Sequence, residues 1–388
     1  MTILAKPKRI LFLLSDTGGG HRAAAQAIQT AIEQQYPNVY EFNTIDVFKC
    51  CATFPYQYMP FFYPLWVTYS SITWQMGYVL TDGRLRSRFF LDATYPRWKP
   101  KIEAMINAQN PDLIICTHSL INRAVLKTLQ TMPKRIPFIT VVTDLVSTPV
   151  SWYQPLADLC LVPTVEAYER GLKVGMKPEQ MQITGLPVHP DFVLHLSDKQ
   201  SARRELGWLP YKTTVLLVSG GDGMGPVYKT VKAINEQGFD IQLAIVAGRN
   251  ERLKRQLNRL DWQQPTYIYP FVNYMATLMA AADILITKAG PATITEACTA
   301  GLPMILSGRV PGQEDGNVRF VVNNKAGVFA PKPQMVVDYL RAWLEADPSV
   351  REVYSRTARQ LAQPYAAWRV ADVVHQLLES SEIPSKIN

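Results

Sequence analysis

The sequence Ile10-Leu-Phe-Leu-Leu14 is followed by Ser15-Asp-Thr-Gly-Gly-Gly-His21 and then by the helix-forming stretch Arg22-Ala-Ala-Ala-Gln-Ala-Ile28. A strand, a glycine turn and a helix in this order form the ligand site of many α/β proteins, because glycine lets the backbone approach a ligand and a helix start offers free N–H donors. The turn also holds a histidine. An imidazole at the end of a strand has a pKa near neutrality and can take a proton from an incoming hydroxyl, so His21 is a candidate general base.

Short apolar runs alternate with helical patterns along the rest of the chain. Runs rich in isoleucine, valine and leucine that end at a polar residue or a glycine are typical of buried parallel strands. The runs are residues 10–14, 113–116, 138–142 and 159–162 in the first half, and 215–218, 243–246, 284–286 and 304–306 in the second. This spacing predicts an α/β chain with two Rossmann-like domains.

A stretch rich in proline and glycine, residues 185–190, separates the two series of runs and is interpreted as a linker. A chain of 388 residues also exceeds the usual size of a single core, so two domains are expected. We predict a first domain over residues 1–190 and a second over residues 191–365. Residues 366–388 carry a helical pattern, and we expect this last helix to pack back on the first domain.

The composition is that of a globular protein with a basic balance. The formal net charge is +8 and the sequence pI is about 9.1, which favours anionic partners such as phosphate-bearing ligands, nucleic acid or an acidic membrane surface. The five cysteines are odd in number and show no C-x-x-C spacing, which argues against a disulfide framework or a structural zinc site. No apolar segment is long enough to span a bilayer and no signal peptide is evident, so a cytoplasmic protein is expected.

Residues 48–101 interrupt the alternation with many aromatic and basic side chains. Tyrosine and tryptophan favour the headgroup boundary of a bilayer, and cations are attracted to anionic lipid, so this insertion predicts a membrane-docking surface. Two other interpretations stay open, namely aromatic residues buried under helices that cover the sheet, and stacking on nucleic acid. No nucleic-acid-binding motif accompanies the cluster, and we expect no nucleic-acid partner. The aromatic residues are Phe54, Tyr56, Tyr58, Phe61, Phe62, Tyr63, Trp66, Tyr69, Trp74, Tyr78, Phe89, Phe90, Tyr95 and Trp98.

The second half has its own glycine-rich turn, residues 219–225, directly after the run 215–218. Four glycines at a strand end can wrap a diphosphate with backbone amides. The turn departs from the G-x-G-x-x-G pattern of dinucleotide folds because Pro226 stands at the third glycine. The first turn satisfies a loose form of that pattern, with Glu41 and Asp46 about where a ribose-binding acid would fall, so a dinucleotide site there remains an alternative.

The stretch Thr287-Lys-Ala-Gly-Pro-Ala-Thr-Ile-Thr-Glu-Ala297 follows another buried run. Gly290 makes the turn and Pro291 suits the first position of a helix, so the amino end of this helix faces a phosphate. Glu296, one turn further on, is placed to accept hydrogen bonds from ribose hydroxyls, although a capping or solvated carboxylate would look the same. In the loop 311–317, Gln313 and Glu314 either bind sugar hydroxyls or belong to an ordinary polar loop.

These motifs together resemble the monogalactosyldiacylglycerol synthase family. The resemblance runs over about residues 8–375 and is carried, in matching order, by residues 15–22, 143–145, 185–188, 220–225, 248–250, 287–297 and 311–317. It implies a GT-B fold, in which two Rossmann-like domains face each other across a cleft. The enzymes of this family are similar to the bacterial diacylglycerol glucosyltransferases and, more distantly, to the lipid II N-acetylglucosaminyltransferase.

The resemblance also implies roles for individual residues. His21 would serve as the base or position the acceptor, with Asp144 and Trp152 on the acceptor side. Phe271 or Val272 would lie near the uracil, Glu296 on the ribose, and Gln313 and Glu314 at the donor sugar. The donor-binding residues that it implies are Gly19, Gly20, Gly220, Gly221, Gly223, Gly248, Arg249, Phe271, Val272, Lys288, Gly290, Pro291, Ala292, Thr293, Glu296, Gln313 and Glu314.

The activity that follows is an inverting transfer of a hexose, with galactose expected, from a UDP-sugar to the sn-3 hydroxyl of 1,2-diacylglycerol. The product would be a β-linked monoglycosyldiacylglycerol. No Asp-x-Asp triplet occurs in the chain, so we expect no metal and no other cofactor, with helix amino ends and Lys288 stabilising the diphosphate. The expected location is the inner, cytoplasmic face of a membrane with an anionic surface, as a peripheral protein.

Three alternatives remain at this point. A diacylglycerol glucosyltransferase that uses UDP-glucose, and that can add more than one sugar, would share nearly all of these motifs. An NAD-dependent oxidoreductase would use the first glycine turn but leave the second glycine-rich half unexplained. A non-catalytic nucleotide-sugar-binding protein would share the two Rossmann-like domains.

Overall fold

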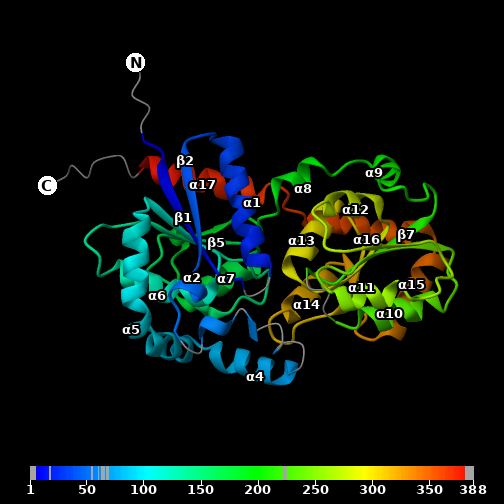
Figure 1. Cartoon of the computed structure of the whole chain (residues 1–388), viewed down its shortest axis with the longest axis horizontal. Coiled ribbons are helices and arrows are strands. Elements are labelled where there is room, and N and C mark those ends of the chain that lie inside the picture. Colours follow the sequence, from blue (N-terminus) through cyan, green and yellow to red (C-terminus); the bar gives the residue numbers. More distant parts are fainter. Residues whose placement is uncertain are drawn as a thin grey trace, which may run out of the picture. The chain divides into compact units, whose positions relative to one another are not determined.

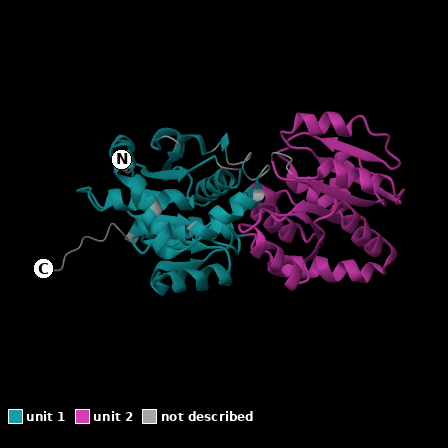
Figure 2. Ribbon diagram, turned by 90° about the horizontal axis from the view of Figure 1, so that it is seen from below, with its two compact units in different colours: residues 1–190, 365–388 teal, residues 191–364 magenta. Residues whose placement is uncertain are grey.

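The computed structural model describes residues 6–16, 19–53, 56–59, 61, 62, 66, 70–221 and 225–380. The chain forms two compact units (Figure 2). Unit 1 contains Met1–Pro190 and Tyr365–Asn388, and unit 2 contains Asp191–Pro364. Each unit is a parallel sheet covered by helices, and each has its own buried core.

The sheet of unit 1 has the strand order β2-β1-β3-β4-β5-β6, and every neighbouring pair is parallel. Its inner strands are buried throughout or nearly so because they are covered by helices on both faces. The strands are β1 (Lys8–Leu14), β2 (Tyr40–Asp46), β3 (Leu113–Cys116), β4 (Phe138–Val141), β5 (Leu159–Val162) and β6 (Met181–Ile183).

The two faces of this sheet have separate cores. On one face α1 packs beside the last helix of the chain, α17 (Figure 1). Ile28 and Ile32 of α1 and Val370 and Val374 of α17 belong to one buried core on this face. On the other face α2, α5 and α6 bury Phe48, among others. The helices of unit 1 are α1 (Gly20–Gln35), α2 (Val47–Cys50), α4 (Ser71–Thr81), α5 (Arg84–Gln109), α6 (Ser119–Leu129), α7 (Val165–Val174) and α17 (Ala366–Ser380), with the 3-10 turns η1 (Tyr56–Tyr58), η2 (Val150–Trp152) and η3 (Pro178–Gln180).

The aromatic insertion divides between core and surface. Phe48 and Trp98 are buried and meet edge to face, with ring centroids 5.7 Å apart, so for these two the core interpretation holds. Several others stand exposed, as the docking interpretation requires. The exposed aromatic residues are Tyr58, Phe61, Phe62, Trp66 and Phe89. Phe54, Tyr63 and Tyr69 lie outside the described residues.

The sheet of unit 2 has the order β12-β11-β10-β7-β8-β9 and is also parallel throughout. Its strands are β7 (Thr213–Val218), β8 (Ile241–Val246), β9 (Thr266–Tyr269), β10 (Ile284–Lys288), β11 (Met304–Gly308) and β12 (Gly327–Phe329). Its helices are α8 (Pro190–Leu194), which starts in the linker, α9 (Lys199–Leu206), α10 (Val227–Asn235), α11 (Glu251–Leu257), α12 (Met275–Ala281), α13 (Pro291–Ala300), α14 (Asp315–Asn323), α15 (Pro333–Glu345) and α16 (Pro348–Leu361).

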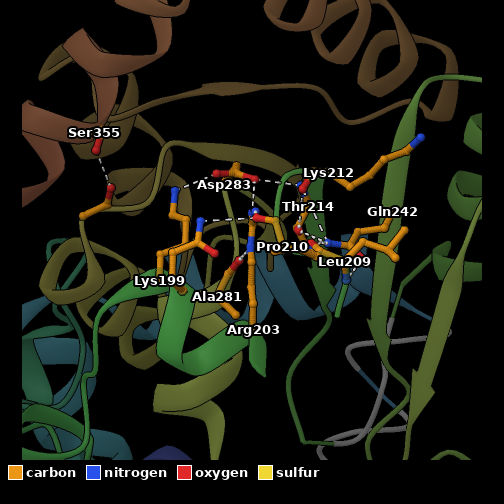
Figure 3. Close-up of polar contacts among 12 residues, drawn as sticks. Lys199, Arg203, Leu209, Pro210, Lys212, Thr214, Gln242, Ala281, Asp283 and Ser355 are labelled. Carbon is orange, nitrogen blue, oxygen red and sulfur yellow. Dashed lines mark hydrogen bonds and ion pairs between the residues drawn. The ribbon is translucent and has the colours of Figure 1, made fainter. Parts of the chain in front are cut away.

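A buried arginine closes the amino end of this sheet. Arg203 of α9 donates to the carbonyls of Ala281 and Pro210, at 2.9 and 2.6 Å, and to the carboxylate of Asp283 at 2.6 Å (Figure 3). Asp283 also accepts from the backbone N–H of Thr214, at the start of β7. Because burying a charge is costly unless it is paired and hydrogen-bonded, this network fixes α9 against the strands. The polar groups of this end are thus engaged with one another.

All eight apolar runs that the sequence identified form strands, whereas β2, β6, β9 and β12 were not predicted. These four are the outermost strands of the two sheets. None of the helices among the described residues combines the length and the apolar character that a membrane crossing needs.

Candidate functional site

Each sheet has one point from which the strand order runs outward to both edges, so the chain builds the sheet first on one side of this point and then on the other. This point lies between β1 and β3 in unit 1, and between β7 and β10 in unit 2. In open α/β sheets, ligands bind outside the carboxyl ends of the strands at such a switch point. The turn with His21 follows β1 and Thr117 follows β3, while the turn with Gly220 follows β7 and Lys288 ends β10. The topology therefore gathers the predicted residues at the expected place in each unit.

His21 is oriented through its Nδ1 atom. Nδ1 lies 2.7 Å from the backbone carbonyl of Thr117 and 2.9 Å from Oγ1 of Thr143. A carbonyl oxygen only accepts hydrogen bonds, so Nδ1 carries the proton and Nε2 keeps its lone pair. Thr117 also donates from Oγ1 to the carbonyl of His21, at 3.1 Å, which holds the first turn of α1. The imidazole therefore has the tautomer that a base acting through Nε2 requires.

The surroundings of His21 keep it uncharged. Burial lowers its pKa to about 4, although the hydrogen bond to the Thr117 carbonyl favours the protonated form. An unfolded histidine binds a proton near pH 6.5 and the folded one only near pH 4, so acidification across this interval lowers the free energy of unfolding. At neutral pH the side chain is a neutral imidazole, ready to accept a proton.

A second histidine, His118, lies beside His21 and was missed in the sequence. The two ring centroids are 4.5 Å apart, and His118 also meets the ring of Phe48 edge to face at 5.3 Å. Burial, together with the nearby His21, lowers the pKa of His118 below its ordinary value. A signal was available, since Thr117 and His118 directly follow the buried strand β3, as the glycine turn follows β1.

Residues 143–152, which follow β4, form the third side of this site and are called the 143–152 segment below. Thr143 contacts His21, and Trp152 donates from Nε1 to Oδ2 of Asp144 at 2.7 Å. Trp152 is fully buried, with its ring 6.3 Å from that of His21. The predicted acceptor-side residues therefore do lie near His21, but the indole is enclosed by the protein and holds Asp144 in place.

The two acids that a dinucleotide site would need are placed differently. Asp46 accepts from the backbone N–H of Asp16 at 3.0 Å through Oδ2, and from that of Lys49 at 3.1 Å through Oδ1, where it caps α2. Glu41 stands exposed on the outermost strand β2. Asp46 thus supports the backbone of the glycine turn and of α2, which leaves the dinucleotide alternative without its ribose contact.

In unit 2 two glycine turns approach each other closely. Gly220 and Gly248 have φ angles of +68° and +63°, a region that favours glycine. A Cβ atom at Gly248 would lie 2.4 Å from the carbonyl oxygen of Gly221, and the neighbouring Arg249 donates its backbone N–H to that same oxygen at 2.8 Å. Only glycine fits at position 248, and the two turns form one continuous backbone surface after β7 and β8.

The side chains of Arg249, Phe271 and Lys288, all predicted from the sequence, line these turns. The guanidinium of Arg249 stacks on the ring of Phe271 at 4.3 Å, and Phe271 is about half exposed. Lys288 donates to Oε1 of Glu314 at 2.6 Å. Oε2 of Glu314 accepts from the backbone N–H of Val310 at 2.7 Å, and the carboxylate is buried. Glu314 therefore binds Lys288 with one oxygen, while the Val310 N–H holds the other. The resemblance places Glu314 at the donor sugar, and that role stays a prediction.

The helix α13 begins as the sequence predicted. Its N-cap is Gly290 and its first residue is Pro291, and no described side chain caps its free N–H groups. These groups, with the positive end of the helix dipole, suit a phosphate. Glu296 is partly buried on this helix, and burial raises its pKa to about 7. A polar ligand that hydrogen-bonds to this carboxyl would stabilise it, because burial has removed it from water.

The remaining predicted residues lie as follows. Gly19 and Gly20 are exposed, and a Cβ atom at either would meet open space. Ala292 and Thr293 complete the first turn of α13, and Val272 and Gln313 are partly buried beside Phe271 and Glu314 in the sequence. Gly223 lies outside the described residues.

Within the described part of the chain, no three histidine, cysteine, aspartate or glutamate side chains are grouped so that they could hold a metal ion. Two of the predicted donor-binding residues of unit 2, Arg249 and Lys288, carry positively charged side chains. Such side chains, with the amino end of α13, can stabilise a diphosphate directly.

The pattern of the monogalactosyldiacylglycerol synthase family matches residues 21–188, and that of the glycosyltransferase family 28 C-terminal domain matches residues 215–346. The chain is 36% identical to monogalactosyldiacylglycerol synthase 1, chloroplastic, of Arabidopsis thaliana over 382 residues, which cover 96% of this chain and 72% of that protein.

The chain also shares its fold with solved structures. The S. aureus MnaA-UDP co-structure matches with a TM-score of 0.65 at 16% identity, covering 98% of this chain and all of that one. Acinetobacter baumannii MurG matches with a TM-score of 0.63 at 14% identity, covering 95% of this chain and all of that one. At this level of identity the likeness concerns the fold alone, and the predicted GT-B class is confirmed.

The state of His21 can be measured by NMR. In spectra of the whole chain labelled at histidine, we expect the Hε1 resonance that disappears in His21→Gln to titrate with a midpoint near pH 4, because burial disfavours the charged ring. A midpoint near pH 6.5 would contradict the partly buried, neutral imidazole described here.

Proposed function

Because this chain belongs to the monogalactosyldiacylglycerol synthase family, we propose that it transfers galactose from UDP-galactose to the sn-3 hydroxyl of diacylglycerol. The chain is a UDP-sugar-dependent glycosyltransferase, since both family patterns and the relatives are of this type. The observation that carries the assignment of the base is the hydrogen bond from His21 Nδ1 to the Thr117 carbonyl. It leaves the Nε2 lone pair of a neutral ring available to a hydroxyl.

The proposed step is a single displacement with inversion. Nε2 of His21 takes the proton as the lipid oxygen bonds to the anomeric carbon, and the bond from that carbon to the diphosphate oxygen breaks. An α-linked donor then gives a β-linked product and UDP. The imidazolium that forms is held by its Nδ1 hydrogen bonds to Thr117 and Thr143. It afterwards returns its proton to solvent, which regenerates the base.

Unit 2 is the proposed donor site. We infer that the diphosphate lies against the free N–H groups at the start of α13, with Lys288 and Arg249 as counter-charges. The half-exposed ring of Phe271 is proposed to lie near the uracil, and Glu296 to accept hydrogen bonds from the ribose. Gln313 and Glu314 are the proposed sugar contacts; each Glu314 oxygen already accepts one hydrogen bond and can accept a second from a sugar hydroxyl.

Galactose is favoured over glucose by the family, whose relatives are named as galactolipid synthases. The alternative donor is UDP-glucose. The two sugars differ only in the orientation of one hydroxyl, and a site that hydrogen-bonds that hydroxyl discriminates strongly against an analogue that cannot offer it in the same place.

An assay with labelled sugars tests this proposal. The protein is incubated with diacylglycerol and either UDP-galactose or UDP-glucose, and the lipids are separated. We expect monogalactosyldiacylglycerol, and His21→Ala should lower kcat by about 10²-fold or more, the usual contribution of a general base, while UDP binding persists in calorimetry. The matched control is His195→Ala, which removes an exposed histidine and should leave kcat unchanged. Transfer of glucose alone would overturn the choice of sugar, and full activity of His21→Ala would overturn the base.

Metal independence is part of the proposal. The chain has no Asp-x-Asp triplet, and the start of α13 with Lys288 offers positive charge in place of a cation. We expect full activity after exhaustive chelation with EDTA. Complete loss that Mg²⁺ restores would count against this mechanism, and dialysed enzyme without chelator is the control.

The acceptor is a lipid, and the surface of α4 offers a place for a membrane. Ile72, Met76, Val79 and Leu80 lie on one side of this helix, at a spacing of three to four residues, and all are more than half exposed. We call these four residues the α4 stripe. No charged residue occurs in α4, and the exposed Arg84 and Arg86 follow directly. An apolar stripe next to cations suits an anionic bilayer, and we propose that the chain docks there as a peripheral protein on the cytoplasmic face.

Co-sedimentation with vesicles tests this docking. Met76→Ser with Val79→Ser should weaken binding to phosphatidylglycerol-rich vesicles by about tenfold or more, since each apolar side chain contributes on the order of 1 kcal/mol even when partly inserted. Val350→Ser with Val353→Ser, which changes two exposed valines of α16, is the matched control and should bind like the wild type. Unchanged binding of the α4 double variant, or a stripe that proves to join two copies of the chain in sedimentation velocity, would refute the proposal.

A further inference from the structure

The side of α4 opposite to the stripe is joined to the 143–152 segment. Tyr78, near the end of the helix, donates from its hydroxyl to the backbone carbonyl of Ser147 at 2.9 Å. Asp82, the residue that ends the helix, accepts from the backbone N–H of Val150 at 2.8 Å. Both bonds reach the backbone of the segment, so they fix its path and are independent of which side chains it carries.

Asp82 is itself held in place. Its second carboxylate oxygen lies 2.5 Å from a terminal nitrogen of Arg170 on α7, and its own side chain is largely buried. Tyr78 is mostly buried too, and burial together with the charges of Asp144 and Asp82 raises the pKa of its hydroxyl, which therefore stays a donor. Hydrogen bonds of this kind are stronger where water is excluded. The end of α4 and the 143–152 segment therefore form one connected unit.

The 143–152 segment in turn contacts the base. Its first residue, Thr143, lies 2.9 Å from Nδ1 of His21. Val150, whose N–H is bound by Asp82, begins the turn η2, which ends at the buried Trp152 and its hydrogen bond to Asp144. A continuous set of contacts therefore runs from the α4 stripe through Tyr78 and Asp82 to the surroundings of His21.

We propose that Tyr78 and Asp82 are positioning residues that couple contact of the α4 stripe with an anionic lipid surface to the placement of the 143–152 segment at His21. This inference rests on the proposed function. A membrane can favour one arrangement of the segment only to the extent that it binds that arrangement more tightly, and the two backbone bonds supply such a difference. Bound α4 then holds the segment where the lipid hydroxyl meets the base. A monomeric acceptor brings no membrane to α4, so activity on it does not draw on this coupling in wild type or variants.

The test compares two forms of the acceptor. Long-chain diacylglycerol is presented in phosphatidylglycerol-rich vesicles, and a short-chain diacylglycerol is presented as a monomer without vesicles, each with UDP-galactose as donor. The variants are Tyr78→Phe, which removes one oxygen atom, Asp82→Ala, and Asp82→Asn, which keeps an oxygen for the Val150 N–H. Tyr36→Phe is the matched control, because its hydroxyl donates to Asp372 on α17, away from α4.

We expect Tyr78→Phe and Asp82→Ala to bind vesicles like the wild type, yet to lose at least about fivefold in kcat on vesicles, with the KM for UDP-galactose unchanged and monomeric activity near that of the wild type. Asp82→Asn should retain more activity on vesicles than Asp82→Ala, and Tyr36→Phe should behave as the wild type. An equal loss on both acceptors, which a merely structural role would produce, or no loss on vesicles, would overturn the coupling. If wild-type protein transferred sugar to neither acceptor, the proposed function itself would have failed.

Discussion

Parallel strands all leave their sheet at the same edge, and this constraint determines where every candidate residue lies. In unit 1 the turns after β1, β3 and β4 bring His21, Thr117 and Thr143 within hydrogen-bond distance, although Thr117 and Thr143 lie 96 and 122 residues after His21 in the sequence. In unit 2 the turns after β7 and β8 meet at Gly221 and Gly248, and the end of β10 supplies Lys288. The opposite end of that sheet is closed by the buried charge of Arg203.

The same geometry gives the two units different chemistry. Unit 1 presents an imidazole whose proton is fixed on Nδ1 by a backbone carbonyl and whose burial keeps it neutral. Unit 2 presents positive charge and free N–H groups, at Arg249, Lys288 and the start of α13. A base in one unit and an anion site in the other are the two groups that a transfer from a nucleotide sugar to an alcohol requires. The membership of the chain in a lipid galactosyltransferase family accords with this division.

Sequence reasoning located what depends on local patterns and missed what depends on packing. The inner strands were predicted because burial on both faces demands continuous apolar runs. The outermost strands are hidden for other reasons: β2 and β6 mix polar with apolar residues, β9 is only partly buried, and β12 has three residues. His21 was predicted from its glycine turn, but its neighbour His118 comes from a strand a hundred residues away. Trp152 is buried and Glu314 is engaged with Lys288, which no spacing in the sequence could have indicated.

The central claim is that neutral His21 removes the proton from the lipid hydroxyl. The most direct test is the pH dependence of kcat/KM for a monomeric diacylglycerol at saturating UDP-galactose. Since burial sets the pKa of His21 to about 4, kcat/KM should stay level from neutral pH down to about pH 5 and fall only as the pH approaches 4. A fall centred near pH 6.5, or the same profile and the same kcat/KM in His21→Gln, would contradict the account.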